Sequence, residues 1–123
     1  MIEIPVMNRM RPQVKIGEQL FEVQMSESDI LERQCALYNT FSRLTKESPA
    51  KNAPDSKQAE YASKVIALKH EMLRFVDEVL GEGAFKAISG GGFVDDKTLA
   101  KITVTVREAA IEAIAEEVER MYE

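Results

Sequence analysis

The longest amphipathic stretch of the chain is DSKQAEYASKVIALKHEMLRFVDEVLGEGAFKAI, residues 55–88. Its apolar residues recur at steps of three and four, as they do on one face of an α-helix. Charged residues of both signs fill the other side, as on a solvated face. The stretch predicts a helix over about residues 55–80, capped by Asp55 or Ser56 and closed by a left-handed Gly81. The expected inward residues are Ala59, Ala62, Val65, Ile66, Met72, Leu73, Val76, Val79 and Leu80.

Two glycine-rich breaks follow this helix. A short helical turn at residues 84–88 is expected between them, and residues 89–94 form a glycine-rich turn. Asp95 and Asp96 then suit the N-cap and first turn of a last helix, over about residues 96–121. Its expected inward residues are Leu99, Ile102, Val106, Ala109, Ala110, Ala113, Ile114, Val118 and Met121.

The last helix contains one ambiguous segment, Thr103-Val104-Thr105-Val106. Four β-branched residues in a row also suit a strand. The helical stripe continues on both sides of them, and this continuity favours a helix.

Residues 1–25 are expected to form an N-terminal arm with a β-hairpin. Two β-type runs, residues 14–16 and 20–23, are separated by Gly17-Glu18-Gln19. A lone hairpin is only marginally stable, so Phe21 and Val23, or else Leu20, must pack on a helix. Ile2, Ile4 and Val6 alternate with other residues and indicate a further short edge strand.

A first helix is predicted over about residues 26–47. Ser26 followed by Asp29 resembles a capping box. Cys35 is expected to fill the core, because nothing in the sequence places a base or a cation beside it. Residues 48–54, SPAKNAP, read as an exposed loop. The expected stripe of this helix is Ile30, Leu31, Leu37, Tyr38, Phe41 and Leu44.

These elements predict a single domain over residues 1–123, mostly α with a small N-terminal β-hairpin (α+β). The net charge of −5 disfavours nucleic acid and anionic lipid as partners. No segment approaches the ~18–20 apolar residues of a membrane span, and no signal peptide is recognised. The single cysteine excludes an internal disulfide and suits a reducing compartment, so we expect a cytoplasmic protein.

No residue pattern indicates catalysis, a cofactor or a metal. The section GEGAFKAISGGG lacks the spacing of a phosphate-binding loop, although a small nucleotide-binding or regulatory protein stays an alternative. His70 is the only histidine and is interpreted as structural. The carboxylates of Asp77 and Glu78 point about 100° apart on a helix, which suits a solvated face rather than a metal site. We therefore expect a protein that is not an enzyme.

Two features suggest partner binding. Acidic residues gather at the C-terminal end of the last helix, where the helix dipole is already negative; the alternative is an acidic tail that only aids solubility. The unpaired edge of the N-terminal strand suits addition to another sheet or self-association. The candidate partner-binding residues are Glu116, Glu117, Glu119, Met72, Phe85 and Met121.

A family resemblance is carried by two parts of the sequence. One is the hairpin core, Val14, Ile16, Gly17, Leu20, Phe21 and Val23; the other is FVDEVLGEGAFKAI, residues 75–88. From about Val14 onward, these parts and their order resemble the tail assembly chaperone family of long-tailed (siphovirus-type) phages and prophages. In that family a similar F-x-D-x-x-L/F-G-x-G stretch often precedes a closing helix.

The resemblance implies a function in phage tail morphogenesis. Such a chaperone binds and solubilises the tape measure protein and helps recruit tail tube subunits, in the host bacterial cytoplasm. The alternative is a structural head-tail connector or tail terminator subunit that remains in the virion. A tape measure protein and a tail tube protein are thus the expected partners.

Overall fold

The computed structural model of the chain describes residues 11–122. The described part holds two strands and four helices, in the order β1 Gln13–Ile16, β2 Gln19–Glu22, α1 Glu27–Glu47, α2 Asp55–Leu80, α3 Ala84–Ser89 and α4 Asp96–Met121. The predicted fold class is confirmed, the helix bounds agree to within one residue at α1 and α3 and fully at α2 and α4, and residues 103–106 are helical. The edge strand expected around Ile2, Ile4 and Val6 lies outside the described residues.

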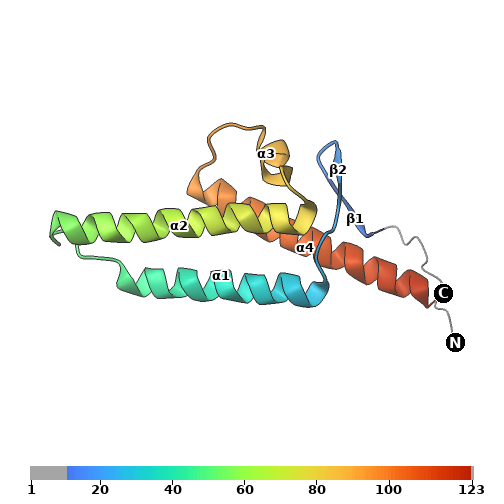
Figure 1. Cartoon of the computed structure of the whole chain (residues 1–123), viewed down its shortest axis with the longest axis horizontal. Coiled ribbons are helices and arrows are strands. Elements are labelled where there is room, and N and C mark those ends of the chain that lie inside the picture. The colour runs from blue at the N-terminus through green and yellow to red at the C-terminus, as the bar shows by residue number, and fades with distance from the viewer. Residues whose placement is uncertain (1–10, 123) are drawn as a thin grey trace, which may run out of the picture.

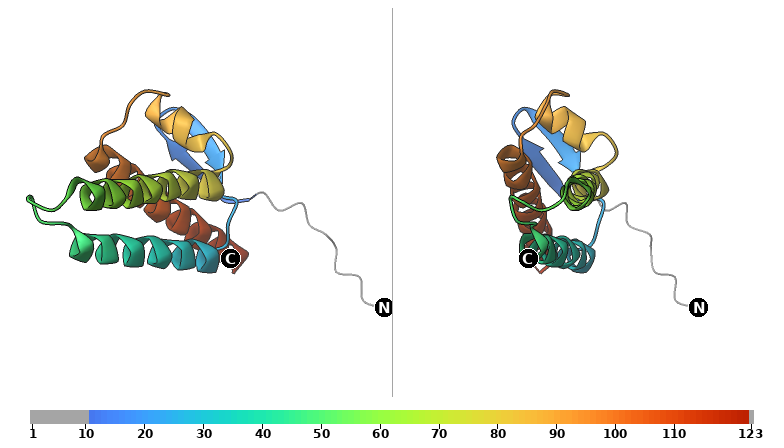
Figure 2. Two further views of the ribbon diagram at one scale, coloured as in Figure 1. Left: turned by 60° about the vertical axis from the view of Figure 1, so that its left-hand side comes forward. Right: turned by 90° about the vertical axis from the view of Figure 1, so that its left-hand side faces the viewer.

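The three long helices pack together, with α3 and the hairpin on the side away from α1. In Figure 1, α1 and α2 run antiparallel and side by side, while α4 crosses behind α2 at an angle. The end-on view in Figure 2 places α1, α2 and α4 at the corners of a triangle. Because α4 is tilted, its N-terminal half diverges from α1, and its C-terminal end extends past the other two helices.

The core lies around the C-terminal half of α2. Phe75, Val76 and Val79 have no exposed surface there, and Ile30 of α1 and Val106 of α4 close around them. Burying side chains of this size provides the main stabilising free energy of a small domain.

The predicted inward face of α2 was partly wrong. Ile66 is 53% exposed, whereas Leu68 and Phe75, which the prediction left out, are buried. Ile66 and Phe75 are nine residues apart, which at about 100° per residue places them on opposite sides of the helix. Ala59, Ala62 and Leu73 are also exposed.

The hairpin packs through one face. Val14 pairs with Phe21 across the strands, and Val14 and Val23 are buried, whereas Leu20 is 67% exposed. The first of the two expected packing modes is therefore the one observed. The connection has two residues, Gly17-Glu18, rather than the predicted three, because Gln19 already pairs with Ile16. Gly17 has φ +62°, as a type II′ turn requires at its first central position.

The helix caps follow the sequence at α1 and α4. The side chain of Ser26 accepts a hydrogen bond from the Asp29 N–H at 3.2 Å, and Asp95 accepts one from the Thr98 N–H at 2.8 Å. At α2 the prediction was wrong, because the N-cap is Pro54 and no side chain caps the helix.

The glycine break after α2 also differs from the prediction. Gly81 has φ +105° and ψ 156°, which is not the left-handed helical conformation; Gly83 adopts that conformation instead. The carboxylate of Asp77 accepts hydrogen bonds from the N–H groups of Gly83 and Phe85. Asp77 is half-buried and caps α3, so the expectation of a solvated carboxylate was wrong.

Candidate partner-binding groove

An apolar groove of about 390 Å³ opens where α4 diverges from α1. Residues of α2 form its floor, and residues of α1 and α4 form its two walls. We call it the α1–α4 groove. Its floor is Tyr61, Val65, Leu68, Lys69 and Met72, with the fully buried Phe75 beneath them; its α1 wall is Gln34, Leu37, Tyr38, Phe41, Leu44 and Thr45; its α4 wall is Asp96, Leu99, Ala100, Thr103, Val104 and Arg107.

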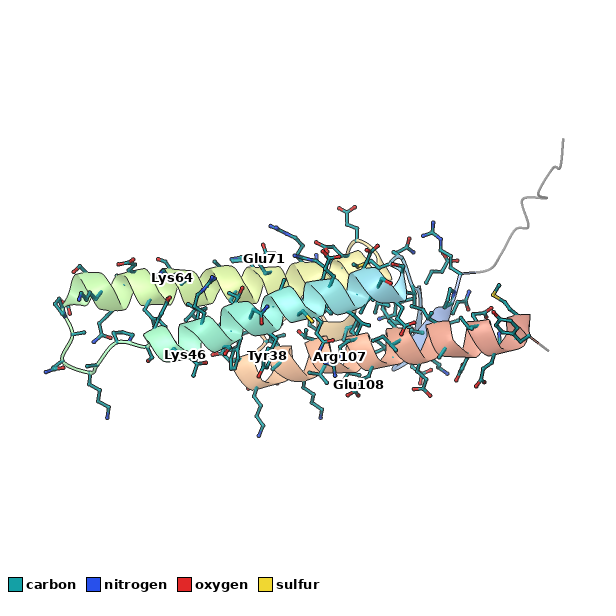
Figure 3. The ribbon with its side chains drawn as sticks, turned by 90° about the horizontal axis from the view of Figure 1, so that it is seen from below. Tyr38, Lys46, Lys64, Glu71, Arg107 and Glu108 are labelled. Atoms are coloured by element: carbon teal, nitrogen blue, oxygen red, sulfur yellow. The ribbon has the colours of Figure 1, made fainter. Side chains whose placement is uncertain are left out.

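Two aromatic side chains on α1 are the most exposed large apolar residues of the groove. Tyr38 is 66% exposed and Phe41 is 59% exposed, and Val104 on the opposite wall is 43% exposed. Residues 38 and 41 are neighbours on one helix face. Figure 3 shows Tyr38 on α1 and Arg107 on α4, on the two walls of the groove. The groove therefore presents aromatic and aliphatic surface to solvent.

The exposure of α1 has a geometric cause. Ile30, Leu37 and Leu44 repeat every seven residues and face the other helices. Leu31 and Tyr38, each one residue further on, lie about 100° around the helix and are exposed. The predicted apolar stripe of α1 therefore includes residues that pack on the other helices and residues that no helix covers. Cys35 is also exposed, so its predicted role as core filler was wrong.

Ion pairs connect the helices around the groove. Lys69 of α2 contacts Asp96 of α4 at 2.7 Å, at one end of the groove. On the seam between α1 and α2, Arg33 contacts Glu71 at 3.2 Å and Glu78 at 3.0 Å. Burial alone lowers the pKa of Arg33, but its hydrogen bonds to Glu71 and Glu78 and their charges raise that pKa overall. Arg33 therefore stays charged, and these partly exposed pairs fix geometry more than they add stability.

The six predicted binding residues do not form one surface. Met72 is half-buried in the floor of the α1–α4 groove. Phe85 is only 8% exposed and belongs to the core, so its side chain offers no surface to a partner.

The other four predicted binding residues lie at the C-terminal end of α4. Glu116 and Glu119 are exposed there, and Glu117 pairs with Arg120 at 2.9 Å. Met121 is 59% exposed and Val118 is 46% exposed, so their predicted inward positions were wrong, since α4 extends past the bundle at this end.

The prediction missed Tyr38, Phe41 and Val104 as surface residues. The available signal was the width of the apolar surface on α1, which spans more of the helix than one packing partner covers. Contiguous exposed apolar surface of this kind is typical of protein interaction sites.

Other groups of possible chemical interest stand apart from the groove. His70 is exposed on α2. Within residues 11–122, no three His, Cys, Asp or Glu side chains are placed to hold a metal ion together. None of the helices in this range has the length and apolarity needed to cross a membrane.

Comparison with known proteins identifies no relative of this chain. No protein-family model matches the sequence, and no curated protein or solved structure matches it either.

Proposed function

We propose that the protein is a phage tail assembly chaperone that binds apolar helical segments of the tape measure protein and keeps them soluble. The observation that carries the proposal is the α1–α4 groove, with Tyr38 and Phe41 exposed on one wall. A helix with an apolar stripe is a typical ligand of such a groove. The hairpin and the FVDEVLGEGAFKAI segment, which carry the family resemblance, are consistent with this function.

The test is co-expression with the tape measure protein encoded in the same gene cluster. We expect the tape measure protein to precipitate alone and to form a soluble complex with the chaperone, which affinity pull-down and light scattering would detect. A tape measure protein that stays insoluble and is not captured would contradict the proposal.

A pair of variants tests the groove itself. Tyr38→Ser with Phe41→Ser removes aromatic surface from the groove, and we expect it to lose most of the captured tape measure protein. Ile66→Ser with Leu73→Ser is the matched control, because these two α2 side chains are exposed and do not line the groove. Equal capture by both variants would place the binding surface elsewhere.

The acidic end of α4 is the second candidate surface for the same partner. Replacing Glu116, Glu117 and Glu119 together by Ala is expected to weaken tape measure binding, and more at low salt than at high salt, because salt screens exposed charges. Unchanged affinity at low salt would remove this end of α4 from the interface.

The alternative function is a head-tail connector or tail terminator subunit that remains in the virion. The exposed apolar residues at the end of α4, Val118, Met121 and Tyr122, are compatible with a contact between subunits. Closed rings of the isolated protein and its presence in purified virions would favour this alternative. Recruitment of the tail tube protein, tested by pull-down from a mixture with the tape measure complex, would favour the chaperone.

A further inference from the structure

The charges around the α1–α4 groove differ in sign from those of the whole chain. The chain carries a net charge of −5. Of the charged residues that line the groove, Lys69 is paired with Asp96, and Arg107 contacts Glu108, which lies outside the lining, at 3.3 Å. Each pair joins one positive and one negative side chain, so the net charge beside the groove depends on the other charged residues around it.

Lys97 and Lys101 provide that net charge. They lie seven and three residues before Val104, so all three residues are on the same side of α4. Both lysines are exposed, and neither has an ion-pair partner within the described part of the chain. Neither lysine lines the groove itself, but both flank Val104 on α4, so within the described residues this flank carries two unpaired positive charges beside the Arg107–Glu108 pair.

The opposite wall carries no compensating acid. Residues 34–45 of α1, QCALYNTFSRLT, contain no Asp or Glu. An apolar groove with a basic edge on an otherwise acidic protein attracts a ligand that combines apolar and acidic groups.

The length of the groove fits a short helix. Its walls run from Gln34 to Thr45 on α1 and from Asp96 to Arg107 on α4. Each span is eleven helical steps, or ~16 Å, which is about three turns of a bound helix. Three turns place apolar side chains at i, i+3 or i+4, and i+7 into the groove and leave flanking positions at its edge.

We propose that the α1–α4 groove binds an amphipathic helix whose apolar stripe is flanked by acidic residues, with those acids on the side of Lys97 and Lys101. This inference rests on the proposed function, because the helix is taken to belong to the client protein that the chaperone keeps soluble. The inference adds that the client segment is acidic beside its apolar stripe. It assigns to Lys97 and Lys101 the preference of the groove for such a segment.

The test uses two designed peptides of about 14 residues with the same Leu stripe in an Ala-rich helix. One carries Glu at the flanking positions and the other carries Lys. Fluorescence anisotropy with the full chain is expected to give a Kd at least ~10-fold lower for the Glu peptide at low salt, with a smaller ratio at high salt. Equal affinity for the two peptides would overturn the proposal.

Charge-reversed variants assign the preference to the groove edge. Lys97→Glu with Lys101→Glu is expected to abolish or reverse the preference for the Glu peptide. Lys15→Glu with Lys86→Glu makes the same change in net charge on β1 and α3, outside the groove, and should keep most of the preference. An equal loss in both variants would show only a long-range effect of net charge and would overturn the assignment of Lys97 and Lys101.

The tape measure co-expression separates this inference from the proposed function. If the Glu peptide competes with the tape measure protein for the chaperone, both stand. If the tape measure protein is captured and the Glu peptide does not displace it, the function stands and this inference fails. If the peptide preference is present but no tape measure protein is captured, the proposed function fails and the groove has another acidic client.

A second copy of the chain is the other occupant of the groove that the experiment must distinguish from a client helix. Light scattering of the chain alone and of the Phe41→Ser variant gives the readout. A wild-type oligomer that dissociates on Phe41→Ser would mean that a second copy fills the groove, and the proposal of an acidic client helix would be overturned. A monomeric wild-type chain that binds the Glu peptide supports it.

Discussion

The carboxylate of Asp77, in the last turn of α2, accepts a hydrogen bond from the backbone N–H of Phe85 at 2.8 Å. It also accepts one from the Gly83 N–H at 3.3 Å. A side chain of one helix therefore caps the next helix across the glycine break. Because Phe85 is a core residue, this cap also holds α3 against the rest of the domain.

Asp77→Ala is expected to lower the free energy of unfolding by about 1–2 kcal/mol, the usual cost of losing a helix cap. Urea denaturation would measure the loss. Glu82→Ala is the matched control, because Glu82 is an exposed acid in the same connection, and its change should stay within about 0.5 kcal/mol. Similar losses in the two variants would mean that charge, and not capping, is responsible.

The conformation of Gly81 gives a second prediction. Its φ of +105° with ψ 156° is strained for any residue with a Cβ, although no atom lies within 4 Å of the Cβ position. Gly81→Ala is expected to destabilise the protein by about 1–3 kcal/mol through backbone strain alone. Gly92→Ala, at a glycine without a positive φ, should be neutral or stabilising by up to about 1 kcal/mol. Thermal unfolding of the two variants makes the comparison, and a neutral Gly81→Ala would show that the connection relaxes.

Local signals in the sequence were enough to place the helices. Ser26 and Asp95 cap their own helices within three residues, and the glycines interrupt the chain where α2 and α3 end. Such signals depend on a few neighbouring residues, so they can be read without knowledge of the tertiary structure.

The faces of the helices could not be predicted in the same way. An apolar stripe has the same spacing whether or not another helix covers it. Tyr38 and Phe41 are exposed where the tilted α4 diverges from α1, and this tilt belongs to the tertiary structure. The cap formed by Asp77 was missed for a related reason. The prediction for Asp77 considered only its neighbour on α2, whereas the N–H groups that donate to Asp77 lie beyond the glycine break.

The corrected face of α2 leads to a third prediction. Phe75→Ala is expected to cost about 3–5 kcal/mol, because Phe75 has no exposed surface and the variant leaves a cavity. Ile66→Ala, on the opposite side of α2, should cost less than about 1 kcal/mol, because Ile66 is 53% exposed. Urea midpoints of the two variants distinguish the observed packing from the sequence prediction, which placed Ile66 inside. A larger loss for Ile66→Ala would contradict the structure.

The N-cap of α4 predicts a pH dependence. Hydrogen bonds from Thr98, first from its side chain and second from its backbone N–H, hold the pKa of the Asp95 carboxyl below its ordinary value of 3.8. A carboxyl whose pKa is lower in the folded state adds stability above the unfolded-state pKa, and this stability is lost as the pH falls through the folded-state pKa.

Asp95→Asn keeps a good N-cap residue but removes the titrating charge. The wild-type protein should therefore be more stable than this variant near neutral pH, and the difference should shrink as the pH falls below 3.8. Urea denaturation of both proteins across this range measures the difference. Asp95→Ala separates the effect of the cap from the effect of the charge, because it removes the side-chain hydrogen-bond acceptor. This variant should be less stable than the wild-type protein at both neutral and acidic pH. A wild-type advantage over Asp95→Asn that does not change with pH would mean that the ionised form of Asp95 is not what stabilises α4.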